Sequence, residues 1–294
     1  MSVSRKEDIT DQQMEFAAEL VKGIMTNLNI PIPEEQQLQD QLRSIYRLMG
    51  ILQKNLKNKK NAKLAKEYLQ VAKWDLEAAR LLNKKKVFSL SIYHLQQAIE
   101  KTAKCCGAIF FGMSKEELKR YNHKSPLVFI EALKKELDLI NSLYSQNEDL
   151  SRAIADAENI INKRPANIAR LDKDEISQLL NYTQNLKKAM NKEEIASAIS
   201  LICSMLSGDE KGESAPISPS QVYGSLGFVA EVINPYFLSI ITYPHESYTR
   251  YPDGEIKPED YNEDLGIVQM CKDICNSLEK TQEMIETWLD KILR

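Results

Sequence analysis

The sequence predicts an all-α protein, and three observations support this class. Apolar residues recur every three or four positions over long stretches, which is the period of an amphipathic helix. Glycine and proline, which most often interrupt helices, number only ten each among 294 residues. No stretch shows the sustained alternation of apolar and polar residues that marks a half-buried strand. We therefore expect long helices joined by few turns.

The N-terminal residues 1–60 predict a helical hairpin. Thr10 and Gln13 have the spacing of a capping box, which marks the start of a helix. The stretch "IPIP" ends this helix, because proline cannot continue the ladder of backbone hydrogen bonds. A second helix is expected over about 34–57. We interpret this hairpin as an addition to the domain that follows.

Two long helices are expected next, over 64–83 and 87–111. Each carries one apolar stripe at helical spacing. The three lysines of 84–86 form a short basic turn between them. A further helix is expected over about 126–147, because Ser125 is a favoured N-cap residue and the proline after it suits the first turn.

The second half of the chain predicts more helices on both sides of a linker. Residues 139–206 contain two or three of them. Residues 207–221 are small and polar and include both glycine and proline, which predicts a linker. A helix over about 226–242, with a kink at Pro235, is expected next. The last helix, over about 259–293, has a nearly heptad apolar rhythm.

Composition argues against a membrane span or a secreted protein, so we expect a cytoplasmic location. No apolar run approaches the roughly 18 residues that span a bilayer, and the N-terminus lacks an apolar signal core. The sequence has five cysteines: Cys105, Cys106, Cys203, Cys271 and Cys275. Cys271 and Cys275 lie one helical turn apart with no histidine nearby, so we expect buried free thiols and no metal site.

The net charge of −3 is unevenly distributed along the chain. Residues 54–124 contain 17 Lys and Arg against 6 Asp and Glu, a net charge of +11. Residues 251–294 contain 11 acidic against 5 basic residues. This asymmetry indicates a basic surface that faces an anionic partner. It equally fits oppositely charged helices that lie side by side in one bundle.

Four stretches together resemble the HEPN domain family. "AKEYLQVAKWDLEAARLL", with its Trp74–Asp75 pair, and "SIYHLQQAIEKTAKCCGAIFFG" are similar to the opening helix pair of that family. "NHKSPLVFIEAL" resembles the His-led start of its third helix, and "TRYPDG" resembles the Arg-Tyr-Pro element before its last helix. The resemblance covers 62–138 and 222–294. Residues 139–206 lie between these parts, and we interpret them as inserted helices.

The resemblance implies a helical up-and-down bundle, usually dimeric, that binds RNA or a nucleotide. Many family members are toxins or defence proteins that cut RNA without a metal, and some are paired with a small nucleotidyltransferase as antitoxin. We therefore expect a homodimer without a cofactor, with RNA or a nucleotide as ligand and such an antitoxin as a partner. The alternative function is a non-catalytic dimerisation or interaction module that acts with a partner protein.

Two Arg/His pairs are candidates for a catalytic site. Active family members carry an Arg followed, after roughly four to six residues, by a His. Here Arg120 and His123 have two residues between them, whereas His245 and Arg250 have four but in reverse order. A histidine can take the proton of a 2′-hydroxyl, and an arginine binds phosphate bidentately. Three interpretations of His123 stay open: a turn or cap residue, a nucleic-acid contact, or a general base.

A second set of residues is expected to bind nucleic acid or a nucleotide through the charge of phosphate. It comprises Lys84, Lys85, Lys86, His94, Lys101, Lys104, Lys119 and Lys124. Glu100 is expected to be buried, with Arg250 as its charged partner, because a core carboxylate needs one. Trp74 and Trp288 are expected to anchor the core or a dimer interface.

Overall fold

The computed structural model describes residues 58–141, 155, 158–159, 161–162, 166–190 and 232–294. Within these ranges the chain is helical and has no strand, which confirms the all-α prediction. The helices are α3 (Lys59–Lys84), α4 (Phe88–Ile109), α5 (Lys115–Arg120), α6 (Pro126–Asn141), α8 (Ala166–Ala169), α9 (Lys173–Met190), α12 (His245–Tyr248), the 3-10 helix η1 (Pro258–Asp260), α13 (Gly266–Gln269) and α14 (Cys271–Leu293). Residues 232–242 are helical as well. The predicted linker at 207–221 and nearly all of the predicted hairpin at 1–60 lie outside these ranges.

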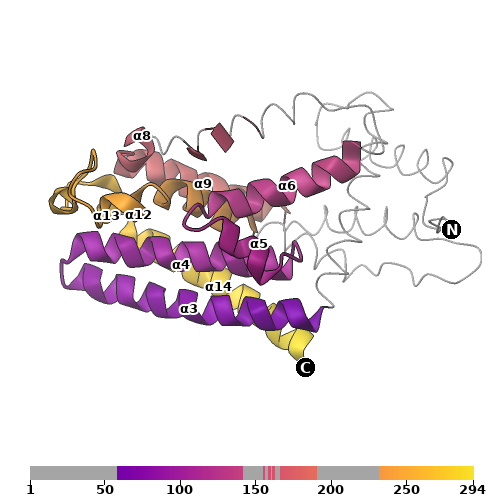
Figure 1. Cartoon of the computed structure of the whole chain (residues 1–294). Helices are drawn as coiled ribbons and strands as arrows, with labels where there is room; N and C mark the ends of the chain where they lie inside the picture. The colour runs from indigo at the N-terminus through magenta and orange to yellow at the C-terminus, as the bar shows by residue number, and fades with distance from the viewer. Residues whose placement is uncertain (1–57, 142–154, 156–157, 160, 163–165, 191–231) are drawn as a thin grey trace, which may run out of the picture. The chain divides into compact units, whose positions relative to one another are not determined.

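Nearly all described residues belong to one compact unit, which consists of Lys54–Lys187 and Ala230–Arg294. The other unit, Met1–Gln53 with Lys188–Val229, lies outside the described residues except for the end of α9. In the compact unit, α3, α4 and α14 lie side by side, although α14 comes at the end of the sequence (Figure 1).

The pairing of α3 with α4 depends on small residues. The buried positions of α3 follow steps of three and four residues, the pattern of an amphipathic helix. Four of the six are alanines: Ala62, Ala65, Leu69, Ala72, Leu76 and Ala79. Because alanine projects little from the helix, the two backbones can approach closely.

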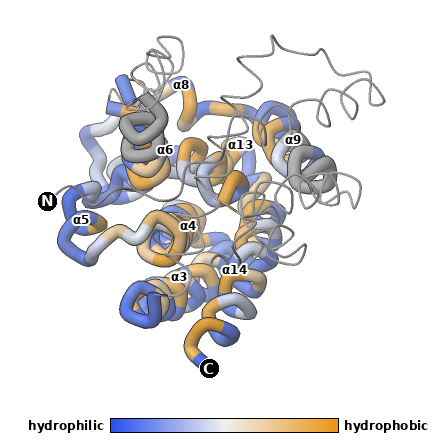
Figure 2. The backbone as a smooth tube through the Cα atoms, turned by 90° about the vertical axis from the view of Figure 1, so that its right-hand side faces the viewer, coloured by the Kyte–Doolittle hydropathy of each residue, from blue (hydrophilic) through white to orange (hydrophobic). Residues whose placement is uncertain are grey.

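The central element is α4, which packs against α3 on one side and α6 on the other (Figure 2). Sixteen of its 22 residues are buried. These include polar side chains, among them Gln96, Gln97, Glu100 and Lys104. Buried polar groups need hydrogen-bond partners. The fold therefore requires a polar cluster around the middle of α4.

Oppositely charged helices do lie side by side in this bundle. Three ion pairs join the basic helix α3 to the acidic helix α14: Lys66–Asp290 at 2.9 Å, Lys73–Glu286 at 2.6 Å and Arg80–Glu279 at 2.6 Å. All three are partly exposed, so each stabilises the fold weakly. Part of the charge asymmetry along the sequence is thus neutralised inside the domain.

The expected last helix is shorter than predicted. Residues 259–270 do not form one continuous helix with α14; they contain the end of η1, a turn, and the separate helix α13. The Asn262 side chain accepts a hydrogen bond from the backbone N–H of Asp264. Such a local bond offers the backbone an alternative to the helical ladder, which explains the break.

The cysteines and the hydropathy of the helices can be compared with the sequence within the described ranges. Cys271 and Cys275 are buried and form no disulfide, as predicted. Cys203 lies outside the described residues. No helix in the described part of the chain combines the length and the hydropathy of a membrane span.

The loop between α5 and α6 is held close to α4 by a glycine. A Cβ atom on Gly107 would lie 2.6 Å from Cδ2 of Leu118 and 2.8 Å from Cγ1 of Val128, so a larger residue would displace these two side chains. Leu118 belongs to α5 and Val128 to α6, which means that both helices approach α4 at this point. The loop residues 121–125 between them are thereby brought against the polar part of α4.

Candidate functional site

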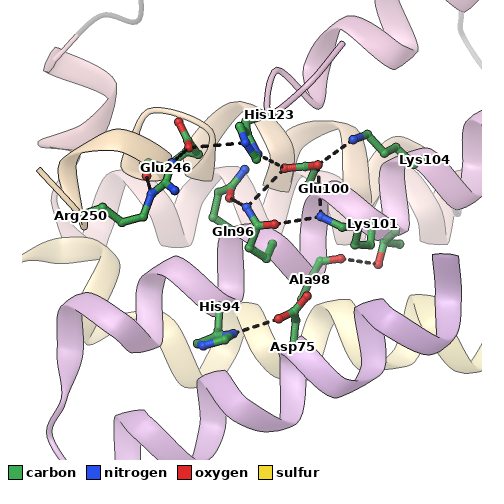
Figure 3. A network of polar contacts seen from close by, with 12 residues as sticks. Asp75, His94, Gln96, Ala98, Glu100, Lys101, Lys104, His123, Glu246 and Arg250 are labelled. Atoms are coloured by element: carbon green, nitrogen blue, oxygen red, sulfur yellow. Dashed lines mark hydrogen bonds and ion pairs between the residues drawn. The ribbon is translucent and has the colours of Figure 1, made fainter. Parts of the chain in front are cut away.

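His123 contacts the buried carboxylate of α4. Its Nδ1 atom lies 2.9 Å from Oε2 of Glu100 (Figure 3). The Glu100 side chain is 1% exposed, whereas the His123 side chain is 42% exposed. The loop "RYNHKSP" therefore places an imidazole between a core carboxylate and the surface.

Glu100 is ionised by its surroundings. Its Oε1 atom accepts a hydrogen bond from Nζ of Lys104 at 2.7 Å and another from Nζ of Lys101 at 3.2 Å. Burial acts to raise the pKa of Glu100, but the charges of Lys101 and Lys104 and the hydrogen bonds from Lys104 and His123 outweigh it and lower this pKa. Gln97 also donates to Glu100, at 3.4 Å.

The charge of Glu100 fixes the tautomer of His123. An ionised carboxylate only accepts hydrogen bonds, so Nδ1 of His123 must carry the proton. In the neutral imidazole, Nε2 is then the basic atom. That atom faces a second carboxylate, because Oε1 of Glu246 lies 3.8 Å away.

Arg250 completes the cluster. Its guanidinium forms an ion pair with Glu246, and its Nε–H donates to the backbone carbonyl of Glu246 at 3.1 Å. The guanidinium carbon also lies 5.2 Å from the ring centre of Tyr93 and 5.1 Å from that of Tyr251. The expected ion pair between Glu100 and Arg250 is therefore not formed: Glu100 pairs with two lysines and His123, and Arg250 pairs with Glu246.

The structure thus brings together one member of each predicted Arg/His pair. His123 and Arg250 both contact Glu246, although they lie far apart in the sequence (Figure 3). Arg120 is exposed at the end of α5 and makes no hydrogen bond or ion pair with the described residues. His245 is 1% exposed, and its Nδ1 lies 2.7 Å from the hydroxyl of Tyr261. Burial lowers the pKa of His245 to about 3, so it is a neutral core residue.

The remaining predicted binding residues lie in different surroundings. His94 pairs with Asp75 at 2.9 Å, away from the Glu100 cluster (Figure 3). Lys86 pairs with Glu263 at 2.7 Å, and Lys124 donates to Asn162 at 2.8 Å. The other exposed predicted lysines are Lys84, Lys85 and Lys119. Of the eight residues, only Lys101 and Lys104 belong to the cluster.

Two buried polar atoms near His123 have no hydrogen-bond partner among the described residues: Nε2 of Gln96 and Oγ of Ser125. Ser125 directly precedes the first residue of α6, Pro126, as predicted, yet its hydroxyl makes no capping hydrogen bond. Gln96 accepts a hydrogen bond from Gln97 and lies beside the cluster in Figure 3. Unpaired buried polar groups are rare. The described residues have a third such atom, Oδ1 of Asn83, near the end of α3.

Glu246 and Tyr93 were not predicted as site residues. The four-residue step from Glu246 to Arg250 is the spacing of a helical ion pair, so a sequence signal existed. Tyr93 carries no such signal. Trp74 was expected to anchor the core or a dimer interface. It is 61% exposed, so it is not part of the core, and its role in a dimer interface stays a prediction.

The cluster has the parts of an acid–base and phosphate site. It contains an oriented imidazole, two carboxylates, two lysines and one arginine. Among the described residues no group of three or more His, Cys, Asp or Glu side chains could hold a metal ion.

The family comparison agrees with this fold. The model of the HEPN domain family matches residues 65–195, so the chain carries a HEPN domain there and the family assignment is confirmed; the predicted resemblance over 222–294 lies outside the match and stays a prediction. The match includes Glu100 and His123, whereas Glu246 and Arg250 follow it in the sequence. No curated protein and no solved structure matches the chain. The boundaries of the predicted inserted segment at 139–206 stay a prediction.

Proposed function

We propose that this HEPN domain binds RNA and cleaves it without a metal, with His123 as general base and Arg250 as the phosphate-binding cation. The observation that carries the proposal is the contact between His123 and Glu100. A buried, ionised carboxylate on Nδ1 holds the imidazole in the tautomer whose Nε2 is basic, while nearly half of the side chain stays open to solvent.

The proposed reaction is an internal transfer. Nε2 of His123 takes the proton of a ribose 2′-hydroxyl, and the 2′-oxygen attacks the adjacent phosphorus. The bond from phosphorus to the 5′-oxygen breaks, and this oxygen takes a proton from a water molecule. The hydroxide that remains takes the proton from the His123 imidazolium, which restores the neutral base. The products are a 2′,3′-cyclic phosphate and a free 5′-hydroxyl. Glu100 stabilises the imidazolium that forms, because its negative charge lies 2.9 Å away.

Arg250 can bind the phosphate without leaving the site. A guanidinium has several N–H donors in a planar fork, and Glu246 occupies only part of them. Tyr93 and Tyr251 hold its position through their ring faces. The cluster as a whole carries three cations against two carboxylates, so it favours an anionic ligand.

The wider setting is proposed on the family resemblance. We propose a cytoplasmic homodimer of the toxin or defence type, with a nucleotidyltransferase as a possible antitoxin partner. The separate non-catalytic function, an interaction module, is favoured by one observation. Apolar side chains are exposed along α3 and at the start of α4: Val71, Trp74, Leu81 and Leu90. Exposed apolar residues that gather on one helix often mark a protein interface.

Incubation of purified protein with single-stranded RNA in excess EDTA tests the proposal. The wild type should cleave, and His123→Ala should lose cleavage by about a hundredfold or more. His94→Ala is the matched control, because His94 is also partly exposed and also lies 2.9 Å from a carboxylate. Both variants should lose about 1.5–3 kcal/mol of stability in urea, since each removes one hydrogen bond to a charged group. Cleavage that survives in His123→Ala would exclude the proposed base.

A further inference from the structure

A pocket lies directly beside Arg250. It is an open depression of about 460 Å³ on the segment 247–254, lined by Ser247, Tyr248, Tyr251, Asp253 and Gly254. This volume is in the range of small-ligand sites. The pocket and the phosphate-binding cation come from the same short segment, so a single ligand could occupy both.

Tyr251 offers a ring for stacking. Its side chain is 51% exposed, an unusual exposure for a large aromatic residue in this domain. The guanidinium of Arg250 lies 5.1 Å from its ring centre and supports the ring from one side. A flat heterocycle that stacks on such a ring is the usual way in which proteins hold an unpaired nucleobase.

Tyr248 and Gly254 form another wall. A Cβ atom on Gly254 would lie 2.7 Å from Cδ1 of Tyr248, so the backbone packs directly on this ring. The close approach fixes the loop that carries Asp253. The aromatic and acidic parts of the pocket are therefore held in place before any ligand binds.

Asp253 determines which base would fit. It is exposed and makes no hydrogen bond or ion pair with the described residues. A carboxylate only accepts hydrogen bonds, so it selects a base edge with donors. Guanine presents N1–H and the N2 amino group side by side, which matches the two carboxylate oxygens. Adenine presents one amino group beside the lone pair of N1, which a carboxylate repels.

We propose that this pocket is a guanine subsite, in which Tyr251 stacks on the base and Asp253 accepts from its N1–H and N2 amino groups. The inference rests on the proposed function for its phosphate end, where Arg250 holds the phosphate of the same nucleotide. It adds a substrate class: RNA with an unpaired guanosine at the cleaved position.

Calorimetric titration of the full chain with guanosine, inosine and adenosine 3′-monophosphates tests the subsite, because the cleaved phosphate is the one on the 3′-oxygen. The guanine nucleotide should bind about tenfold more tightly than the other two, since inosine lacks the N2 amino group. Asp253→Asn should remove this preference. Glu255→Gln is the matched control, because it removes the same charge from an exposed residue of the same loop outside the pocket. Tyr251→Ala should weaken all three nucleotides about tenfold, and Trp74→Ala, another exposed aromatic residue, should not.

His123→Ala separates the failure of this inference from the failure of the proposed function. If it abolishes RNA cleavage but keeps the guanine preference, both proposals are supported. If the wild type cleaves RNA and neither binding nor cleavage prefers guanosine, the subsite is overturned while the cleavage proposal stands. If guanine binds through Asp253 but RNA is not cleaved, the cleavage proposal fails and the subsite stands.

Discussion

His123 and Glu100 are joined by a 2.9 Å contact between Nδ1 and the carboxylate, although they are 23 positions apart in the sequence. The contact connects a surface loop to the central helix of the bundle. Its carboxylate is almost completely buried and is neutralised by Lys101 and Lys104. Stability and the proposed chemistry therefore depend on the same side chain.

Glu100→Ala should destabilise the fold strongly. The substitution leaves Lys104, which is 8% exposed, without its charged partner. Breaking a buried ion pair by removing one partner costs about 3–5 kcal/mol. Glu279→Ala is the control, since its ion pair with Arg80 is partly exposed and should cost about 1 kcal/mol or less. Urea unfolding at pH 7 measures both, and equal losses would contradict the account.

His245 should make the domain acid-sensitive. Its pKa in the fold is about 3, well below the ordinary value of 6.5, so only the unfolded chain takes up a proton between these values. The stabilising contribution is complete above about pH 6.5 and is lost as the pH falls toward 3, at about 1.4 kcal/mol for each pH unit. In His245→Gln, the free energy of unfolding should depend less steeply on pH between pH 6 and 4. The slope should fall by the contribution of one proton, about 1.4 kcal/mol for each pH unit. An unchanged slope would show that His245 does not stay neutral in the fold.

The basic turn between α3 and α4 should contribute to RNA binding through charge alone. Replacement of Lys84, Lys85 and Lys86 by Glu should weaken binding at about 50 mM salt and reduce the salt dependence of the affinity. The melting temperature should change little, because all three side chains are exposed. Lys59, Lys60 and Lys63, exposed at the other end of α3, are the control for the same change in net charge. Equal weakening by both triple variants would mean that the turn has no special role.

The exposed apolar residues of α3 should form the interface of the expected homodimer. Light scattering at micromolar concentration should report about twice the chain mass of 33.6 kDa. Trp74→Glu should shift the protein toward the monomer, since a charge on that face opposes association. Tyr251→Glu changes an exposed aromatic residue elsewhere and should leave the dimer intact. A monomeric wild type would remove this prediction.

The helices of the core could be predicted because their evidence is local. The apolar steps of α3 and α4 and the proline at the start of α6 specify those elements directly. The break between η1 and α13 could not, because it depends on a side-chain bond of Asn262 that competes with helix formation. Similarly, the exposure of Trp74 depends on the direction in which α3 faces its neighbours, which periodicity alone leaves open.

The site could be predicted only in part. The sequence pointed to both loops, "RYNHKSP" and "HESYTR", but it paired arginine with the nearest histidine in each. Packing joins the loops to α4 instead, so that His123 meets Glu100 and Arg250 meets Glu246. Which side chains share a carboxylate is decided by contacts between segments distant in the sequence.

The most direct test compares two arginines in the metal-free cleavage assay. Arg250→Ala removes the cation that shares Glu246 with His123, whereas Arg120→Ala removes an exposed cation with no ion pair among the described residues. Circular dichroism should first establish that both variants keep their helical content. The account predicts that Arg250→Ala lowers the cleavage rate by about a hundredfold or more, as expected for loss of a cation that stabilises the transition state, and that Arg120→Ala stays close to the wild type. Loss of cleavage in Arg120→Ala, with full activity in Arg250→Ala, would contradict it.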